Sequence, residues 1–313
     1  MHPDWQAQVT AAYQLGISAQ MRARITHDDD PIARQFLPDA RELHILDAER
    51  HDPIGDFAHS PVPFLVHRYR NRVLWKITPT CAVYCRFCFR KEFIGRLGEA
   101  PDGDARAAAL DYIRADSGIE EIILSGGDPL TLTPGKLRQY LAPVREIAHV
   151  RRVRIHTRVP VVAPERITAA LIDALCTAGK PLVVILHANH AREFGAQAAA
   201  ALQQLRTHAM LLSQSVLLKG VNDSVAALAD LMNAFLDHHV APYYLHHLDL
   251  AKGTSHFRLT LAEGEALYHA LRERLSGLAL PRYIVEIPGG EGKVEVLRLS
   301  AEQRQRLAAM GIE

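Results

Sequence analysis

Short apolar segments recur along the chain from residue 73 onward, and longer segments of mixed polarity separate them. These apolar segments are Val73–Thr78, Glu121–Ser125, Arg152–His156, Leu182–His187, Leu211–Leu217 and Pro242–Leu248. Apolar strands without polar alternation are typical of a parallel sheet that is covered on both faces. Between them, apolar residues at helical spacing predict amphipathic helices at Ala105–Ala115, Ala196–Leu205 and Leu261–Leu275. The pattern therefore predicts repeated strand–helix units.

Six such units are too few to close an eight-stranded barrel. We therefore expect an α/β protein whose residues 73–282 form a partial, open (β/α)6 barrel of TIM-like form. Residues 1–72 are predicted to be a mainly helical N-terminal extension, because Trp5–Arg24 has apolar residues at roughly helical spacing. Residues 283–313 would form a C-terminal segment. In such folds the functional loops follow the C-terminal ends of the strands, so candidate chemistry is sought there.

Composition narrows the class of protein. Hydrophobic residues make up 48% of the chain and charged residues 23%, which excludes a disordered, collagen-like or disulfide-scaffold protein. The net charge of +1 provides no electrostatic reason to expect a nucleic-acid partner. No apolar run approaches the ~20 residues that cross a bilayer, and the first residues do not resemble a signal peptide. We therefore expect a cytoplasmic protein without a membrane partner.

Three of the four cysteines lie within eight residues, directly after the first predicted strand. Cys81, Cys85 and Cys88 have the spacing C-x3-C-x2-C, and such clustering indicates a metal site in a reducing compartment. Three thiolates can hold three irons of a [4Fe–4S] cluster, which normally takes four cysteines, and so leave one iron open. Zinc is the main competitor, but a structural zinc site normally uses four ligands. We interpret Cys176, in a predicted helix, as a small buried apolar residue.

The cysteine motif after the first strand of a partial barrel resembles the signature of radical S-adenosylmethionine (radical SAM) enzymes. Within that superfamily, Cys81–Glu92, CAVYCRFCFRKE, resembles the lysine 2,3-aminomutase family, and the resemblance extends from about Asp30 to Lys293. It implies an isomerase that moves the amino group of L-lysine to the adjacent carbon. It also implies three cofactors: a [4Fe–4S] cluster, S-adenosylmethionine (SAM) as the source of a 5′-deoxyadenosyl radical, and pyridoxal 5′-phosphate (PLP), which holds the migrating nitrogen.

A glycine pair follows the second predicted strand, in Ser125–Pro129. By itself this segment indicates only a tight turn, because glycine is the usual turn residue. The resemblance implies that the segment binds the amino group of SAM, and that two residues at later strand ends lie near the adenosyl group. The SAM contacts implied in this way are Gly126, Gly127, Asp128, His187 and Gln214.

A second glycine-rich segment, Pro288–Lys293, follows the apolar run near the C-terminus. It lacks the spacing of a phosphate-binding Walker loop. The alternatives are a glycine-rich turn with a solvated lysine, or a loop that presents an amine to PLP. The resemblance implies the second, with Lys293 as the catalytic lysine that carries PLP and with Arg68 and Tyr69 beside the cofactor phosphate.

The resemblance also assigns three residues to the substrate. Asp249 ends the sixth predicted strand and would bind the distal ammonium of lysine, since a carboxylate pairs well with an ammonium. Glu286, seven residues before Lys293, would be its acidic partner, at a position where the family normally has aspartate. Arg90 would hold the substrate α-carboxylate, for which a planar guanidinium is suited.

Two departures from the family bear on the product. This sequence shows no C-terminal region with the cysteines of an intersubunit zinc site, and Ser224 stands where a further cysteine of that site would be. With Glu286, these features resemble the branch that makes (R)-β-lysine for translation elongation factor P. The expected partners are L-lysine, a reducing electron donor, and elongation factor P or its lysylating ligase. The alternatives are a metabolic lysine 2,3-aminomutase, an aminomutase for another amino acid, and an iron–sulfur electron carrier.

Overall fold

Nine strands form one sheet in the computed structural model, which describes residues 4–94, 100–287 and 292–312. In chain order and in sheet order these strands are β1 (Leu65–Tyr69), β2 (Arg72–Thr78), β3 (Glu121–Gly126), β4 (Arg152–Thr157), β5 (Leu182–His187), β6 (Ala209–Val216), β7 (Ala241–His246), β8 (Arg282–Ile287) and β9 (Gly292–Glu295). Strands β2 to β8 are parallel, and β1 and β9 are antiparallel additions at the two edges. The expected partial barrel is confirmed, with one more parallel strand than predicted because β8 pairs with β7.

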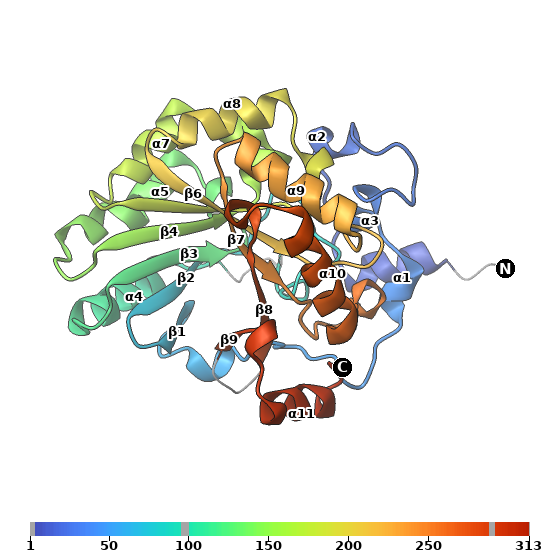
Figure 1. Cartoon of the computed structure of the whole chain (residues 1–313). Coiled ribbons are helices and arrows are strands. Elements are labelled where there is room, and N and C mark those ends of the chain that lie inside the picture. The colour runs from blue at the N-terminus through green and yellow to red at the C-terminus, as the bar shows by residue number, and fades with distance from the viewer. Residues whose placement is uncertain (1–3, 95–99, 288–291, 313) are drawn as a thin grey trace.

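Helices alternate with the parallel strands and cover the outer face of the sheet (Figure 1). The longer ones are α4 (Gly103–Ala115), α5 (Pro134–Leu141), α7 (Ala169–Cys176), α8 (Ala196–Leu205), α9 (Val225–Asp237) and α10 (Leu261–Arg274). Most of them begin where a short polar side chain accepts a hydrogen bond from the first turn, which satisfies an otherwise unpaired N–H group. These capping residues are Asp102, Thr133, Thr168, Ser224 and Thr260. Ser224 thus has a local structural role at the start of α9.

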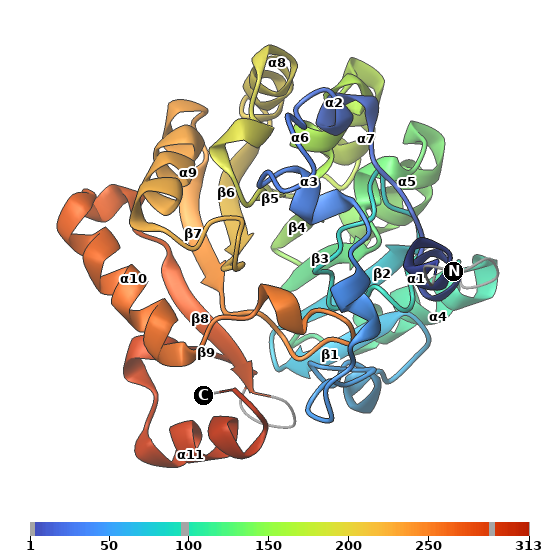
Figure 2. The ribbon, with the colours of Figure 1, turned by 90° about the vertical axis from the view of Figure 1, so that its right-hand side faces the viewer.

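The N-terminal segment lies across the end of the barrel toward which the parallel strands point. Figure 1 shows this arrangement from the side, and Figure 2 looks onto that end. The predicted helical stretch Trp5–Arg24 is two helices, α1 (Trp5–Ala12) and α2 (Ala19–Arg22), and α3 (Ala33–Phe36) follows. Residues 65–69 of the expected helical extension instead form β1, which pairs with β2.

Alternation along β2 shows how the sheet separates a core from a cavity. Val73, Trp75 and Ile77 are buried in the main hydrophobic cluster, with Trp75 edge-on to the ring of Tyr140 on α5. Residues between them, such as Leu74, line cavities at the barrel interior. Burial of the outward side chains stabilises the barrel by about 25 cal/mol for each Å² of apolar surface removed from water. The inward side chains are therefore free to be polar.

The structure corrects the interpretation of Cys176 as a buried residue. The buried positions of α7 and the turn after it are Leu171, Ile172, Ala174, Leu175 and Ala178, and all of them except Ile172 follow the i, i+3, i+4, i+7 pattern of one helix face. Cys176 is one residue beyond Leu175, about 100° further around the helix, and its thiol is exposed to solvent.

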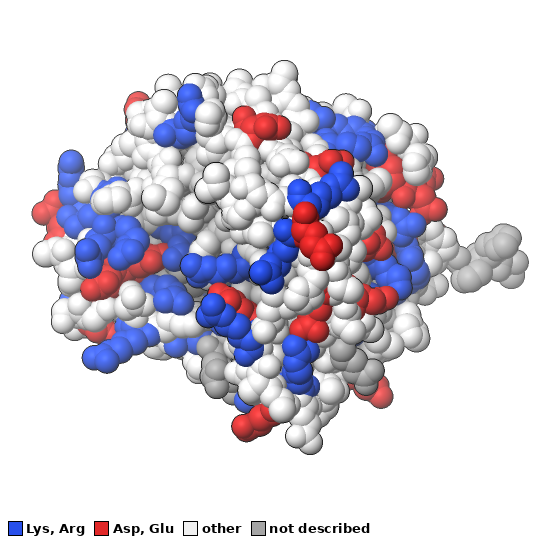
Figure 3. All heavy atoms as spheres, in the orientation of Figure 1, with Lys and Arg blue, Asp and Glu red and all other residues white. Residues whose placement is uncertain are grey.

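A further helix, α11 (Ala301–Ala309), follows β9. Within the described ranges, every helix is too short or too polar to cross a membrane. Acidic and basic side chains are intermixed over the face shown in Figure 3, as the near-zero net charge predicts. This face therefore has no large area of a single charge.

Candidate active site

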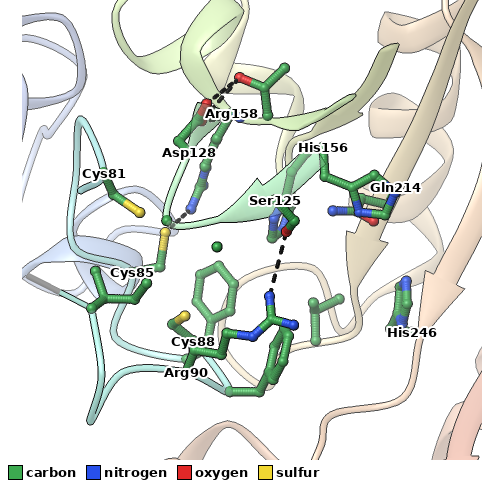
Figure 4. A pocket seen from close by; sticks show the side chains of 18 of the residues that line it. Cys81, Cys85, Cys88, Arg90, Ser125, Asp128, His156, Arg158, Gln214 and His246 are labelled. Carbon is green, nitrogen blue, oxygen red and sulfur yellow. Dashed lines mark hydrogen bonds between the residues drawn. The ribbon is translucent and has the colours of Figure 1, made fainter. Parts of the chain in front are cut away.

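One cavity at the C-terminal ends of the parallel strands contains most of the residues that sequence reasoning singled out (Figure 4). It has a volume of about 210 Å³. The predicted residues in its lining are Cys81, Cys85, Cys88, Arg90, Gly126, Gly127, Asp128, His187, Gln214, Asp249, Glu286 and Lys293. Arg68 and Tyr69 are outside this lining but contact residues within it, as described below. Cys81 and Lys293, which are 212 positions apart in the sequence, thus line the same cavity.

The cysteine loop follows β2 directly. Cys81, Cys85 and Cys88 are free thiols on one side of the cavity, and the backbone N–H of Cys88 donates to the carbonyl of Cys85 at 3.1 Å. Burial raises the pKa of Cys88 to about 11 and also raises the pKa values of the other two thiols. A bound metal reverses this preference because it deprotonates a coordinating thiol. The three buried thiols are therefore suited to bind a positively charged metal group.

The described residues contain no group of three or more His, Cys, Asp or Glu side chains that could surround one metal ion. Three thiols that each ligate a separate iron of a cluster do not need to converge on one point. The three cysteines thus fit a [4Fe–4S] cluster, and the fourth cysteine, Cys176, lies on the outer helix layer, away from the cavity.

The glycine pair packs directly against the backbone that leads into the cysteine loop. A Cβ atom on Gly126 would lie 2.5 Å from the carbonyl oxygen of Thr78, and one on Gly127 would lie 2.3 Å from that of Thr80. Gly126 also has φ of +115°, which other residues rarely adopt. Glycine is therefore required at both positions to bring β3 against the start of the cysteine loop.

The carboxylate of Asp128 is engaged by the protein itself. It accepts hydrogen bonds from the hydroxyl of Thr157 at 2.8 Å and from the backbone N–H groups of Leu130, Arg158 and Val159. These bonds connect the glycine segment to the end of β4 and to α6 (Val159–Val162). Asp128 lines the cavity, but its side chain serves to hold two strand ends in register.

His187 and Gln214 are paired neighbours at the ends of β5 and β6. Burial lowers the pKa of His187 to about 3, so its ring is neutral at physiological pH, and one ring nitrogen lies 3.2 Å from the side-chain oxygen of Asn189. The same cause keeps His156 and His246 neutral. The strand ends therefore present uncharged hydrogen-bonding groups to the cavity.

Lys293 lies on β9, at one edge of the sheet, and also contacts β1 at the other edge. Its amine lies 3.3 Å from one carboxylate oxygen of Glu286, and the guanidinium of Arg68 donates to the other oxygen. Arg68 also donates to the carbonyl of Ile54, and the backbone N–H of Lys293 donates to the Tyr69 hydroxyl at 3.0 Å. Strand β1 thereby brings both predicted phosphate-side residues to Lys293, although residues 288–291 of the predicted glycine-rich loop lie outside the described residues.

Asp249 follows β7 and faces the same group of charges. Burial, with a further contribution from Glu286, raises its pKa to about 7, while Lys293 and Arg90 lower it. Arg90 is not free in this structure, because its guanidinium pairs with Asp56 at 2.7 Å. The pairing shows that Arg90 can bind a carboxylate in this position.

Five further side chains belong to the site and were missed from the sequence. They are Asp56, Ser125, His156, Arg158 and His246. Four of them lie at the end of a strand or follow one directly, so the expectation that functional residues gather at strand ends could have selected these four. Asp56 lies in the N-terminal segment, where no local pattern marks it. Only its contact with Arg90 in the folded structure identifies Asp56 as part of the site.

Comparisons with known proteins agree with this geometry. Residues 75–232 match the radical SAM superfamily, whose enzymes use a [4Fe–4S] cluster and SAM. The chain is 38% identical over 294 residues to the L-lysine 2,3-aminomutase of Clostridium subterminale, and this alignment covers 93% of this chain and 70% of that protein. It is 39% identical over 279 residues to the L-lysine 2,3-aminomutase of Escherichia coli (strain K12), and this alignment covers 88% of this chain and 80% of that protein.

The chain is also 39% identical to the L-lysine 2,3-aminomutase of Methanococcus maripaludis. That alignment covers 86% of this chain but only 62% of the relative's length. Sequence identity of this extent, over most of the chain, assigns the family. The chain belongs to the lysine 2,3-aminomutase family, isomerases of the radical SAM superfamily.

Proposed function

We propose that this protein is a PLP-dependent L-lysine 2,3-aminomutase that forms (R)-β-lysine for attachment to translation elongation factor P. One observation carries the proposal: a single cavity places three free thiols together with an amine, Lys293, and two carboxylates, Asp249 and Glu286. The names of the relatives at 38–39% identity support the lysine substrate. The free thiols suit the reducing cytoplasm, where we place the protein.

Cys81, Cys85 and Cys88 would hold the cluster, and SAM would lie between them and the strand ends that carry His187 and Gln214. When bound, the cluster and SAM supply a carbon radical strong enough to remove hydrogen from an unactivated C–H bond, and PLP holds the migrating nitrogen. The neutral ring of His187 lets it accept or donate one hydrogen bond without adding charge near SAM.

Lys293 would present its amine to PLP, and Arg68 and Tyr69 would lie beside the cofactor phosphate. Glu286 accepts from both Lys293 and Arg68, so it holds two cationic groups at one edge of the cavity. A guanidinium is well suited to a phosphate because it donates parallel N–H groups. The chain thus has a positively charged place for a phosphate and an amine close to it.

Asp249 and Glu286 define the side chain that the cavity accepts. Two neighbouring carboxylates disfavour a third, so an acidic amino acid would be repelled. An ammonium relieves the same repulsion and pairs with both groups. Arg90 would exchange its present partner, Asp56, for the substrate α-carboxylate. These charges favour a substrate with a carboxylate at one end and an ammonium at the other, as in lysine.

The (R)-β-lysine branch is supported by two residues. By the resemblance, Ser224 stands where the metabolic enzymes have a cysteine, and here it caps α9 through its hydroxyl at 3.2 Å from the N–H of Ala227. By the same resemblance, Glu286 stands where the family normally has aspartate, and here it pairs with Arg68. Anaerobic protein with lysine, SAM, PLP and a reductant should form (R)-β-lysine, resolved by chiral chromatography. The (S) isomer would point to the metabolic enzyme, and SAM cleavage without β-lysine would reject lysine as the substrate.

The raised pKa of Asp249 predicts a pH-dependent stability difference in the cofactor-free protein. Because its folded pKa of about 7 exceeds the usual 3.8, folding favours the protonated form. The contribution of protonated Asp249 to the stability of the folded protein is fully present below pH 3.8 and is lost as the pH rises through 7. Glu286, Lys293, Arg90 and Asp56 face this carboxyl and contribute to the shift. Asp249→Asn does not titrate, so its stability relative to wild type should increase from pH 5.5 to pH 8.5.

Urea unfolding of both proteins at several pH values measures this difference. His208→Asn, at an exposed site outside the cavity, serves as a control for a general pH effect. A stability difference that stays constant from pH 5.5 to pH 8.5 would contradict the raised pKa.

A further inference from the structure

Arg158 connects β4 to α6, and its buried guanidinium reaches the cysteine loop. Its Nη1 group lies 2.8 Å from the sulfur of Cys85, and only 6% of its side chain is exposed (Figure 4). Asp128 accepts a hydrogen bond from the backbone N–H of Arg158, which fixes the start of this side chain at the end of β4. The contact is therefore built from both the backbone and the side chain.

Groups from three other segments hold the guanidinium in this position. Its Nη2 group donates to Glu193 at 2.8 Å and to the side-chain oxygen of Gln35 at 2.5 Å. The rings of Phe36 and Phe87 lie 4.7 and 5.5 Å from it. Gln35 and Phe36 belong to α3, so the N-terminal segment closes this side of the cysteine loop. The guanidinium cannot turn away from Cys85 without losing several contacts.

In the ion pair between Arg158 and Glu193, the positive group is the one that contacts the sulfur of Cys85. The carboxylate of Glu193 is completely buried and also accepts from the backbone N–H groups of Asn189 and His190. Its negative charge therefore lies behind the guanidinium, while the positive end contacts Cys85. In a buried site such a field is only weakly screened by water or salt.

We propose that Arg158 sets the reduction potential of the iron–sulfur cluster, an inference that rests on the cluster assignment made above. Reduction transfers one electron from a low-potential one-electron donor to the cluster, and no covalent bond forms or breaks in that transfer. The added negative charge is shared with the cysteine sulfurs, and hydrogen bonds to those sulfurs tune the potential. A charged N–H donor stabilises the reduced form more than the oxidised form. Arg158 thus raises the potential and makes reduction easier.

The test uses the full chain, reconstituted anaerobically with iron and sulfide. Iron and sulfide content is measured first, and the midpoint potential is then measured by a redox titration followed by electron paramagnetic resonance, without SAM or lysine. Arg158→Met should lower the equilibrium constant for reduction about tenfold, a shift of about 59 mV to more negative potential. Arg158→Lys keeps the positive charge and should restore part of the shift.

A second variant removes the risk that an unpaired buried Glu193 unfolds the protein. The double variant Arg158→Met/Glu193→Met removes both charges and should shift the potential in the same direction. Arg166→Met is the matched control, because Arg166 follows α6 but donates to the carbonyls of Leu130 and Thr131. Its potential should equal that of the wild type.

Two outcomes would overturn the inference. One is a wild-type potential in both Met variants at full cluster content. The other is a folded double variant that takes up no cluster, because Arg158 would then serve cluster assembly. A wild-type chain that itself takes up no cluster would instead defeat the proposed function, so the two failures are distinguishable.

Discussion

Replacing Lys293 by alanine should abolish amino-group migration and the absorbance of a PLP imine, with a loss of turnover of about 10³-fold or more. The amine of Lys293 is the group that we expect to bond to PLP, and the structure places it 3.3 Å from Glu286 and against Tyr69 through its backbone N–H. Alanine keeps the backbone but removes the amine. Absorbance spectra with added PLP and a β-lysine assay measure the two effects.

Lys136→Ala is the matched control, because Lys136 is an exposed lysine on α5. This variant should keep both the absorbance and the turnover. The Lys293→Ala protein should still assemble its cluster and cleave SAM slowly, since the cysteine loop is unchanged. Unchanged β-lysine formation by Lys293→Ala would refute the assignment of the PLP lysine.

Replacing Glu42 by alanine should lower the free energy of unfolding by about 3–5 kcal/mol, because it leaves two buried cations without their partner. Glu42 is completely buried and accepts from the guanidinium of Arg86 at 2.9 and 2.5 Å and from the amine of Lys91 at 2.9 Å. Arg86 lies between two of the predicted cluster ligands. Urea unfolding of the cofactor-free protein measures the loss.

Arg41→Ala provides the control in the same segment. Arg41 pairs with Asp39 at the surface, where an ion pair contributes about 0–1 kcal/mol. If Glu42→Ala costs no more than this control, the buried group does not anchor the cysteine loop. We also expect Glu42→Ala to lose a reconstituted cluster faster than the wild type, as followed by its visible absorbance under anaerobic chelation.

Local patterns were sufficient for the barrel and for the cysteine loop. Unbroken apolar runs mark strands buried on both faces, and helical spacing marks the layer that covers them, so element type and order follow from residue type and period. The loop with Cys81, Cys85 and Cys88 was evident because all three ligands lie within one short segment. His187 and Asp249 were assigned through the family resemblance, and their places at or after strand ends agree with it, because parallel strands all end at the same side of a sheet.

Contacts between distant segments could not be read in this way. Arg68 reaches Glu286 across the open edges of the sheet, Glu42 binds Arg86 of the cysteine loop, and Arg158 contacts Cys85. Each of these contacts involves at least one common charged residue, of a type that is ordinarily exposed and has no periodic pattern. Exposure of Cys176 likewise depends on which face of α7 meets the sheet. Hydrophobic period determines which elements form, but only their packing determines which charges are brought together and removed from water.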